Sequence, residues 1–160
     1  MSFDPATFRT ALGHFCSGVT IVSADDGSEI RAITASAFTS VSLTPPLVLV
    51  CVNRSARINE VIQDSKRYAI SILTREQEHL SDRFGRRSEP ADFDFEQWNG
   101  HPVVAGALVH VAADVSDVFD GGDHHIYLGH VRHTQIGGGE PLLYYRGRYH
   151  SRTDRTTQSA

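Results

Sequence analysis

The chain alternates between short runs rich in Val, Ile and Thr and breaks made of Gly, Asp or Pro. No other feature constrains its fold as strongly. Such runs occupy residues 19–23, 31–40, 47–52 and 67–73, and three more lie between residues 107 and 150. Short β-branched runs bounded by turn residues are typical of strands. With about seven strands and few helices between them, the pattern favours a mainly β fold, an antiparallel barrel, over a parallel α/β sheet.

The remaining segments predict how these strands are connected. Residues 19–23 and 31–40 are expected to form a hairpin across an A-D-D-G-S turn, and the three runs after residue 107 are expected to form a meander. Helical spacing of apolar residues predicts helices over 4–16, 56–65 and 74–88, the first of them capped by Asp4 and packed on the core. Residues 89–99 lack periodicity and are expected to form an ordered loop.

Composition limits the class of protein. The 160 residues suit one domain, and a hydrophobic content of 40% with 21% charged residues is typical of a chain that folds. The formal net charge of −4 provides no basic surface for nucleic acid. No apolar run is long enough to span a membrane and no signal peptide precedes the first helix, so a cytoplasmic location is expected. Cys16 and Cys51 lack C-x-x-C spacing, and both are expected to be buried thiols.

Hydroxyl residues alternate along T-A-S-A-F-T-S-V-S-L-T-P-P, residues 34–46. In a strand, this alternation places one set of side chains on a single face: Thr34, Ser36, Phe38, Ser40 and Ser42. Because hydroxyls donate and accept hydrogen bonds, this face could bind a flat, polar heterocycle. A solvated strand face is the alternative, and the alternation does not decide between them.

Residues 54–59, R-S-A-R-I-N, stand where a buried strand gives way to a helix. Ser55, Arg57 and the first N–H groups of that helix could therefore hold an anionic phosphate. Helix capping by Ser55 beside a surface Arg57 is the alternative interpretation.

Four of the nine histidines lie in one predicted hairpin, residues 122–133. Strand alternation turns His124 and His130 to one face and His125 and His133 to the other, so these four cannot converge on one metal ion, and no metal is expected. His124 follows Asp123 at a glycine-rich turn, where a carboxylate could fix the tautomer of the imidazole beside a ligand. Rossmann, P-loop and nucleophile-elbow motifs are absent from the sequence.

Several blocks, taken together and in order, resemble the short-chain flavin reductases, which supply reduced flavin to two-component monooxygenases. The blocks are F-x-x-A-L-G-x-F-x-S-G-V-T-I-V at 8–22, the 34–52 segment, R-S-A-R at 54–57, L-S-D-R-F at 80–84, G-D-H-H-I-Y-L-G-H-V at 122–131 and P-L-L-Y-Y-R-G-R-Y at 141–149. The resemblance implies a split β-barrel of Greek-key topology over residues 1–150 and a homodimer. The polar composition of residues 151–160 predicts a flexible tail.

The resemblance also implies functional residues. NAD(P)H would reduce FMN or FAD by hydride transfer, with His124 guiding the nicotinamide and Tyr149 beside it. Ser55, Ala56 and Arg57 would hold the flavin phosphate, and Phe84 would close on the ligand. The remaining flavin-lining positions would be Thr34, Ser36, Ala37, Ser40, Ser42, Cys51, Val52 and Asn53.

Some choices stay open at this point. The sequence does not distinguish FMN from FAD, NADH from NADPH, or a bound flavin from a diffusing one, and it does not identify the partner monooxygenase. A non-catalytic flavin-binding or electron-carrier protein on the same barrel is one alternative. A metal-binding barrel that uses the C-terminal histidines is another.

Overall fold

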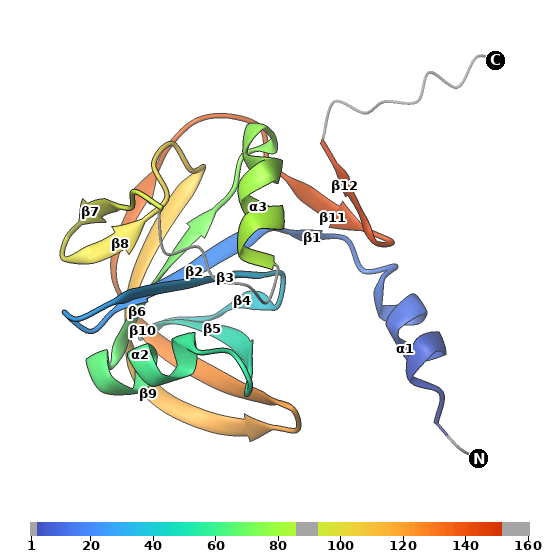
Figure 1. The fold of residues 1–160 in the computed structure, drawn as a ribbon, viewed down its shortest axis with the longest axis horizontal. Helices are drawn as coiled ribbons and strands as arrows, with labels where there is room; N and C mark the ends of the chain where they lie inside the picture. Colours follow the sequence, from blue (N-terminus) through green and yellow to red (C-terminus); the bar gives the residue numbers. More distant parts are fainter. Residues whose placement is uncertain (1–2, 86–92, 152–160) are drawn as a thin grey trace.

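The protein is described by a computed structural model covering residues 3–85 and 93–151 (Figure 1). The helices are α1 (Pro5–Leu12), α2 (Ile58–Ser65), the 3-10 turn η1 (Arg75–Gln77) and α3 (Glu78–Gly85). The strands are β1 (Ser17–Gly18), β2 (Thr20–Asp25), β3 (Ile30–Ala35), β4 (Phe38–Leu43), β5 (Pro46–Asn53), β6 (Arg67–Ile72), β7 (Glu96–Trp98), β8 (His101–Val103), β9 (Val109–Gly121), β10 (His124–Ile136), β11 (Leu143–Tyr145) and β12 (Arg148–His150).

Seven strands form the main sheet in the order β3-β2-β6-β9-β10-β5-β4. Every neighbouring pair in it is antiparallel, so the predicted mainly β, antiparallel fold is confirmed. Its longest pairing is the β9–β10 hairpin, whose register shifts at Leu128/Gly129 and again at Val131/His133. Such bulges bend and twist a strand pair, which helps the sheet to curl.

The two edge strands, β3 and β4, follow one another in the chain and are joined only by Ser36 and Ala37. In a flat seven-stranded sheet the edges would lie about 29 Å apart, six strand spacings of about 4.8 Å. A two-residue link spans at most about 11 Å. The sheet must therefore coil until its two edges nearly meet, yet β3 and β4 do not pair with each other. The predicted barrel thus appears as a coiled, open sheet.

Most of the hydrophobic core lies inside this coil. Tyr68 of β6, Tyr127 of β10 and Val50 of β5 are fully buried there. Helix α2 adds Ile58, Val61 and Ile62 to the same cluster, with its apolar residues one helical turn apart as the sequence predicts. A second cluster packs α3, through Leu80 and Phe84, against Val19, Ile21 and Leu142.

Three predicted connections are wrong. The run at 31–40 is two strands, because the chain breaks at Ser36 and Ala37 and leads β4 to the opposite edge of the sheet. The third strand of the predicted meander instead pairs with β1 and β12 in a separate sheet of order β1-β11-β12. The predicted loop at 89–99 contains β7, which pairs with β8. Parts of two predictions, the helix end at 86–88 and the tail after Ser151, lie outside the described residues.

Helix α1 does not pack on the core as predicted. None of its eight residues, all of them described, is buried, and the helix stands away from the sheet (Figure 1). Asp4 does cap it as predicted, accepting hydrogen bonds from the N–H groups of Ala6 and Thr7. Local capping therefore sets where the helix begins, while its apolar side chains remain exposed. Across the described ranges, every helix falls short of the length and apolar character needed to cross a membrane.

Gly129 of β10 allows the closest approach within the sheet. A methyl group at this position would overlap the hydroxyl of Tyr68 and lie 2.8 Å from its ring carbon Cζ and 2.9 Å from the Cβ of Ala113. We predict that Gly129→Ala lowers the free energy of unfolding by about 1–3 kcal/mol, the usual cost of overpacking a core. Urea unfolding measures this change. Gly138→Ala is the control, because a Cβ there has no neighbour within 4 Å; equal losses in the two variants would contradict the close approach.

Candidate functional site

A cavity of about 650 Å³ opens where the two edges of the coiled sheet approach each other. Its walls come from β3, the Ser36–Ala37 link, β5, the turn after β5, the end of α3 and the start of β10. Its volume falls within the range of about 300–1,000 Å³ that is usual for small-molecule and cofactor sites.

Most of the predicted site residues line this cavity. They are Thr34, Ser36, Ala37, Cys51, Asn53, Ser55, Ala56, Arg57, Phe84 and His124. They come from four separate segments of the chain, 34–37, 51–57, 84 and 124, so the fold brings together positions that the sequence keeps far apart. Their roles toward a ligand stay predictions.

Four predicted residues do not line the cavity: Ser40, Ser42, Val52 and Tyr149. The strand break at 36–37 and a register shift between Ser40 and Ser42 interrupt the alternation on which the hydroxyl face was based. Val52 is fully buried in the core, which leaves only its main chain for contacts elsewhere. The Tyr149 hydroxyl donates to Asp82 Oδ1 at 3.0 Å and lies 2.9 Å from Ser81 Oγ. Burial raises the pKa of this phenol.

The cavity also includes residues that sequence reasoning missed: Arg31, Ala32, Ile33, Ala35, Ile58 and Gly85. Most lie on β3, which was assigned as an ordinary hairpin strand. Its position at the edge of the sheet, which follows only from the strand order, exposes it to the cavity. Arg31 was the one feature of the sequence that could have identified β3 as part of the site, since a cation in an otherwise apolar strand is unusual. Its side chain forms an ion pair with Glu29.

Hydroxyl groups around the cavity hold the walls together. Thr34 Oγ1 donates to the carbonyl oxygen of Ser81 at 2.7 Å and ties β3 to α3. The hydroxyl of Ser55 donates to Asn53 Oδ1 at 2.7 Å, and the Ser55 N–H donates to the same oxygen at 3.0 Å. Ser55 therefore does not cap α2; Arg57 occupies the cap position without a side-chain bond. The alternative interpretation of Ser55 as a helix cap is wrong.

One end of the cavity carries positive charge at the start of α2. Arg57 is exposed there, and its guanidinium has no hydrogen-bond or ion-pair partner within residues 3–85 and 93–151. At this start of the helix the N–H groups of Asn59 and Glu60 donate to main-chain carbonyls, whereas the N–H of Arg57 has no acceptor in the described residues. Together these groups can bind an anion, and the helix dipole acts in the same direction.

His124 lies beside that charged end because β10 pairs with β5, in a register that sets His124 opposite Asn53. Its Nδ1 lies 2.7 Å from Asp123 Oδ1, and this hydrogen bond lowers the pKa of the Asp123 carboxyl. Since an ionised carboxylate only accepts, Nδ1 carries the proton of this bond. In the neutral ring, Nε2 is then left as an acceptor.

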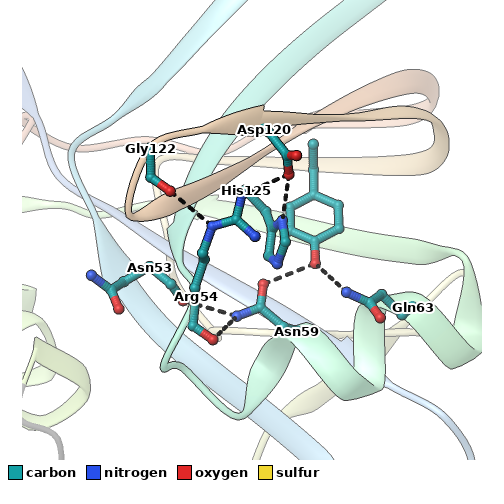
Figure 2. Close-up of polar contacts among 8 residues, drawn as sticks. Asn53, Arg54, Asn59, Gln63, Asp120, Gly122 and His125 are labelled. Atoms are coloured by element: carbon teal, nitrogen blue, oxygen red, sulfur yellow. Dashed lines mark hydrogen bonds and ion pairs between the residues drawn. The ribbon is translucent and has the colours of Figure 1, made fainter.

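Arg54 ties the hairpin that carries His124 to the turn after β5. Its Nε donates to the Gly122 carbonyl at 2.8 Å, and its NH2 group pairs with Asp120 Oδ1 at 2.6 Å (Figure 2). Its main-chain N–H donates to the Asp123 carbonyl at 2.9 Å. The two walls of the cavity are therefore connected by side-chain and main-chain bonds together.

The cavity is equipped for binding and orientation. Cys51 is its one lining thiol among the described residues, and burial raises the pKa of that group, which disfavours the thiolate that a nucleophile needs. Both cysteines are free; contrary to the expectation of two buried thiols, Cys16 is exposed and Cys51 is half-buried. Within the described parts of the chain, no three His, Cys, Asp or Glu side chains are grouped to hold a metal ion. The arrangement suits a flat ligand that carries an anionic group.

Known proteins with similar sequences and structures support this description. The family described as "Flavin reductase like domain" matches residues 12–153. An "NADH-dependent flavin reductase" of a Rhodococcus species is 42% identical over 92% of this chain and 86% of its own length. The "Flavin-dependent monooxygenase, reductase subunit HsaB" of Rhodococcus jostii is 38% identical over 92% of this chain and 78% of its own.

A solved structure agrees with these sequence relatives. The Streptomyces globisporus NADH:FAD oxidoreductase SgcE6, "in complex with NAD and FAD fragments", superposes with a TM-score of 0.88 at 34% identity, covering 98% of this chain and 99% of that one. The resemblance stated from the sequence blocks is thereby confirmed. A matched family that spans most of the residues, with relatives above 30% identity over nearly the whole length, shows that the chain belongs to the flavin reductase-like domain family.

Proposed function

We propose that the chain is an NADH-dependent flavin reductase that supplies reduced FMN or FAD to a partner monooxygenase. The cavity itself supports this function most directly: it brings Arg57, whose guanidinium has no partner in the described residues, close to His124, whose ring is oriented by Asp123. The relatives are named for this chemistry, with NADH as the donor in the Rhodococcus and Streptomyces proteins. NADH is therefore the proposed donor in preference to NADPH.

The residues of the cavity fit a flavin. Strand β3 lines the cavity and has one neighbour in the sheet, so its outer main-chain groups are available to the polar rim of a flat ring. Arg57 and the start of α2 suit the phosphate that FMN and FAD share. Phe84, in contact with Phe93 and Phe95, supplies an aromatic wall. We interpret the coiled, open sheet around this gap as the split barrel predicted from the sequence.

When bound, the flavin supplies the hydride acceptor, so the protein needs no nucleophile of its own. The chain's part is to orient and to exclude water. His124, fixed by Asp123, presents an acceptor nitrogen that can receive the carboxamide N–H of a nicotinamide. Main-chain donors at the strand edges can stabilise negative charge on the ring.

We also propose that two copies of the chain associate through α1. Phe8 is 49% exposed and Leu12 is 57% exposed, on one face of a helix that has no buried residue. The ring of Phe3 contacts that of Phe8, tilted by 59° with the centroids 5.1 Å apart, and extends this apolar surface. Large exposed patches of this kind are typical of interfaces. A cytoplasmic location stays a prediction from the sequence.

The first prediction about function tests the activity. Purified protein should oxidise NADH when FMN or FAD is added, and His124→Ala should raise KM for NADH or lower kcat by about tenfold, the size of one lost oriented hydrogen bond. Affinity for flavin should change little. NADH absorbance and flavin fluorescence measure the two effects. His125→Ala is the control, because its side chain lies outside the cavity; flavin binding without any NADH oxidation would instead indicate a carrier protein.

The second prediction concerns the phosphate. Arg57→Gln should raise Kd for FMN about tenfold, because a charge-assisted hydrogen bond to phosphate contributes about 1.5–3 kcal/mol. Kd for riboflavin, which has no phosphate, should stay within twofold. Fluorescence titration with both flavins measures this. Arg132→Gln, which removes an arginine paired with Asp114 outside the cavity, is the control. An equal rise in both Kd values would place Arg57 away from the phosphate.

The third prediction concerns assembly. Leu12→Asp should convert the protein from dimer to monomer, because it puts a charge into the proposed apolar interface. Light scattering after size-exclusion chromatography measures the mass. Thr10→Asp adds the same charge half a helical turn away and should leave the dimer intact. A wild-type monomer, or a dimer that survives Leu12→Asp, would contradict this interface.

A further inference from the structure

A buried polar pair lies beneath the turn that carries Arg57. Asn59, in the first turn of α2, is only 6% exposed (Figure 2). Tyr127 of β10, which is hydrogen-bonded to it, is fully buried. Neither residue lines the cavity. A buried amide is costly unless all its polar atoms are bonded, so the partners of Asn59 matter.

The amide nitrogen of Asn59 faces three main-chain carbonyls of the turn. Its Nδ2 donates to Ala56 O at 2.7 Å and Asn53 O at 2.8 Å, with a longer contact to Arg54 O at 3.3 Å. One side chain thus hydrogen-bonds to most of the main-chain carbonyls between the end of β5 and the start of α2.

Tyr127 fixes which way this amide points. Its hydroxyl donates to Asn59 Oδ1 at 2.8 Å, and Gln63 Nε2 approaches the same hydroxyl at 3.5 Å. Burial raises the pKa of the phenol, which keeps its proton available for donation. Because the Asn59 oxygen receives this hydrogen, its nitrogen must face the carbonyls.

Holding the carbonyls inward turns the opposite side of each peptide outward. In a trans peptide the C=O of one residue and the N–H of the next point in opposite directions. The N–H groups of Arg54 and Ser55 already have acceptors, Asp123 O and Asn53 Oδ1. The Arg57 N–H, opposite the Ala56 carbonyl, has no such partner in the described chain, and Arg57 lines the cavity.

We propose that Asn59, oriented by Tyr127, is a positioning residue for the flavin phosphate: it turns the peptide between Ala56 and Arg57 so that its N–H faces the anion. This rests on the proposed function, because it assumes that the phosphate binds at Arg57. The Asn59–Tyr127 pair affects the affinity for phosphate without contacting the ligand. It does not affect nicotinamide binding at His124.

The test compares FMN with riboflavin in two variants. Tyr127→Phe releases the amide with almost no change in volume, and Asn59→Leu removes it. Each should raise Kd for FMN by about three- to tenfold, the effect of about one hydrogen bond. Kd for riboflavin and KM for NADH should stay within twofold. The double variant should lose no more affinity for FMN than Asn59→Leu alone, because both changes disrupt the same Asn59–Tyr127 pair.

Ser65→Ala is the matched control. Its hydroxyl bonds to Val61 O and Arg67 O at the other end of the same helix, so it weakens α2 without reaching the turn. Melting temperature should fall in the control with both flavin Kd values unchanged. If wild-type protein binds no FMN, the proposed function fails. If it binds FMN but Tyr127→Phe leaves the FMN-to-riboflavin ratio of Kd values unchanged, the positioning role is overturned, even if Asn59→Leu does not fold.

Discussion

The two-residue link between β3 and β4 is the constraint on which the rest of the structure depends. It joins the opposite edges of a seven-stranded sheet, so the sheet has to coil, and the coil surrounds the core. The edges meet without pairing. A sheet edge carries main-chain donors and acceptors that lack a strand partner, and here the β3 edge and the Ser36–Ala37 link face the cavity. The candidate site therefore lies where main-chain groups of the sheet have no strand partner. Because these groups are available to a ligand, the site needs no glycine-rich phosphate-binding loop.

Strand register then places the side chains around that gap. His124 lies opposite Asn53 in the β10–β5 pairing, so the oriented imidazole lies close in space to the cationic turn that follows β5. More than sixty residues of sequence separate the two. Arg54 reinforces this arrangement by bonding the turn to the hairpin. The ion pair of Arg54 with Asp120 is largely exposed and contributes little by itself. Its main-chain bond to Asp123 and the ladder between the strands fix the geometry.

Sequence patterns predicted the features that depend on interactions between residues close together in the chain. The β2–β3 hairpin, α2 with its inward Ile58, Val61 and Ile62, and the Asp4 cap all follow from spacing over a few residues. The break at Ser36 and Ala37 could not be predicted, because hydroxyls and alanines continue the alternation through it. The position of β3 at an edge, and hence of Arg31 in the cavity, depends on pairings between distant segments. The Asn59–Tyr127 bond joins residues 68 positions apart and has no signal in the sequence.

The hydroxyl face predicted over residues 34–42, together with Ser55, needs a different interpretation from those that the sequence offered. Thr34 and Ser55 line the cavity, but each donates its hydrogen to a protein oxygen, in one case a carbonyl of α3 and in the other the Asn53 side chain. Such hydroxyls can still accept a hydrogen bond from a ligand, but they cannot donate one without breaking the wall. Ser36, at the link, is the hydroxyl of the predicted face that lines the cavity without a bonded partner in the described residues. Donation to an anionic or electron-rich ligand therefore falls to main-chain N–H groups, to Arg57 and to Ser36, while the other hydroxyls keep the gap at a fixed width.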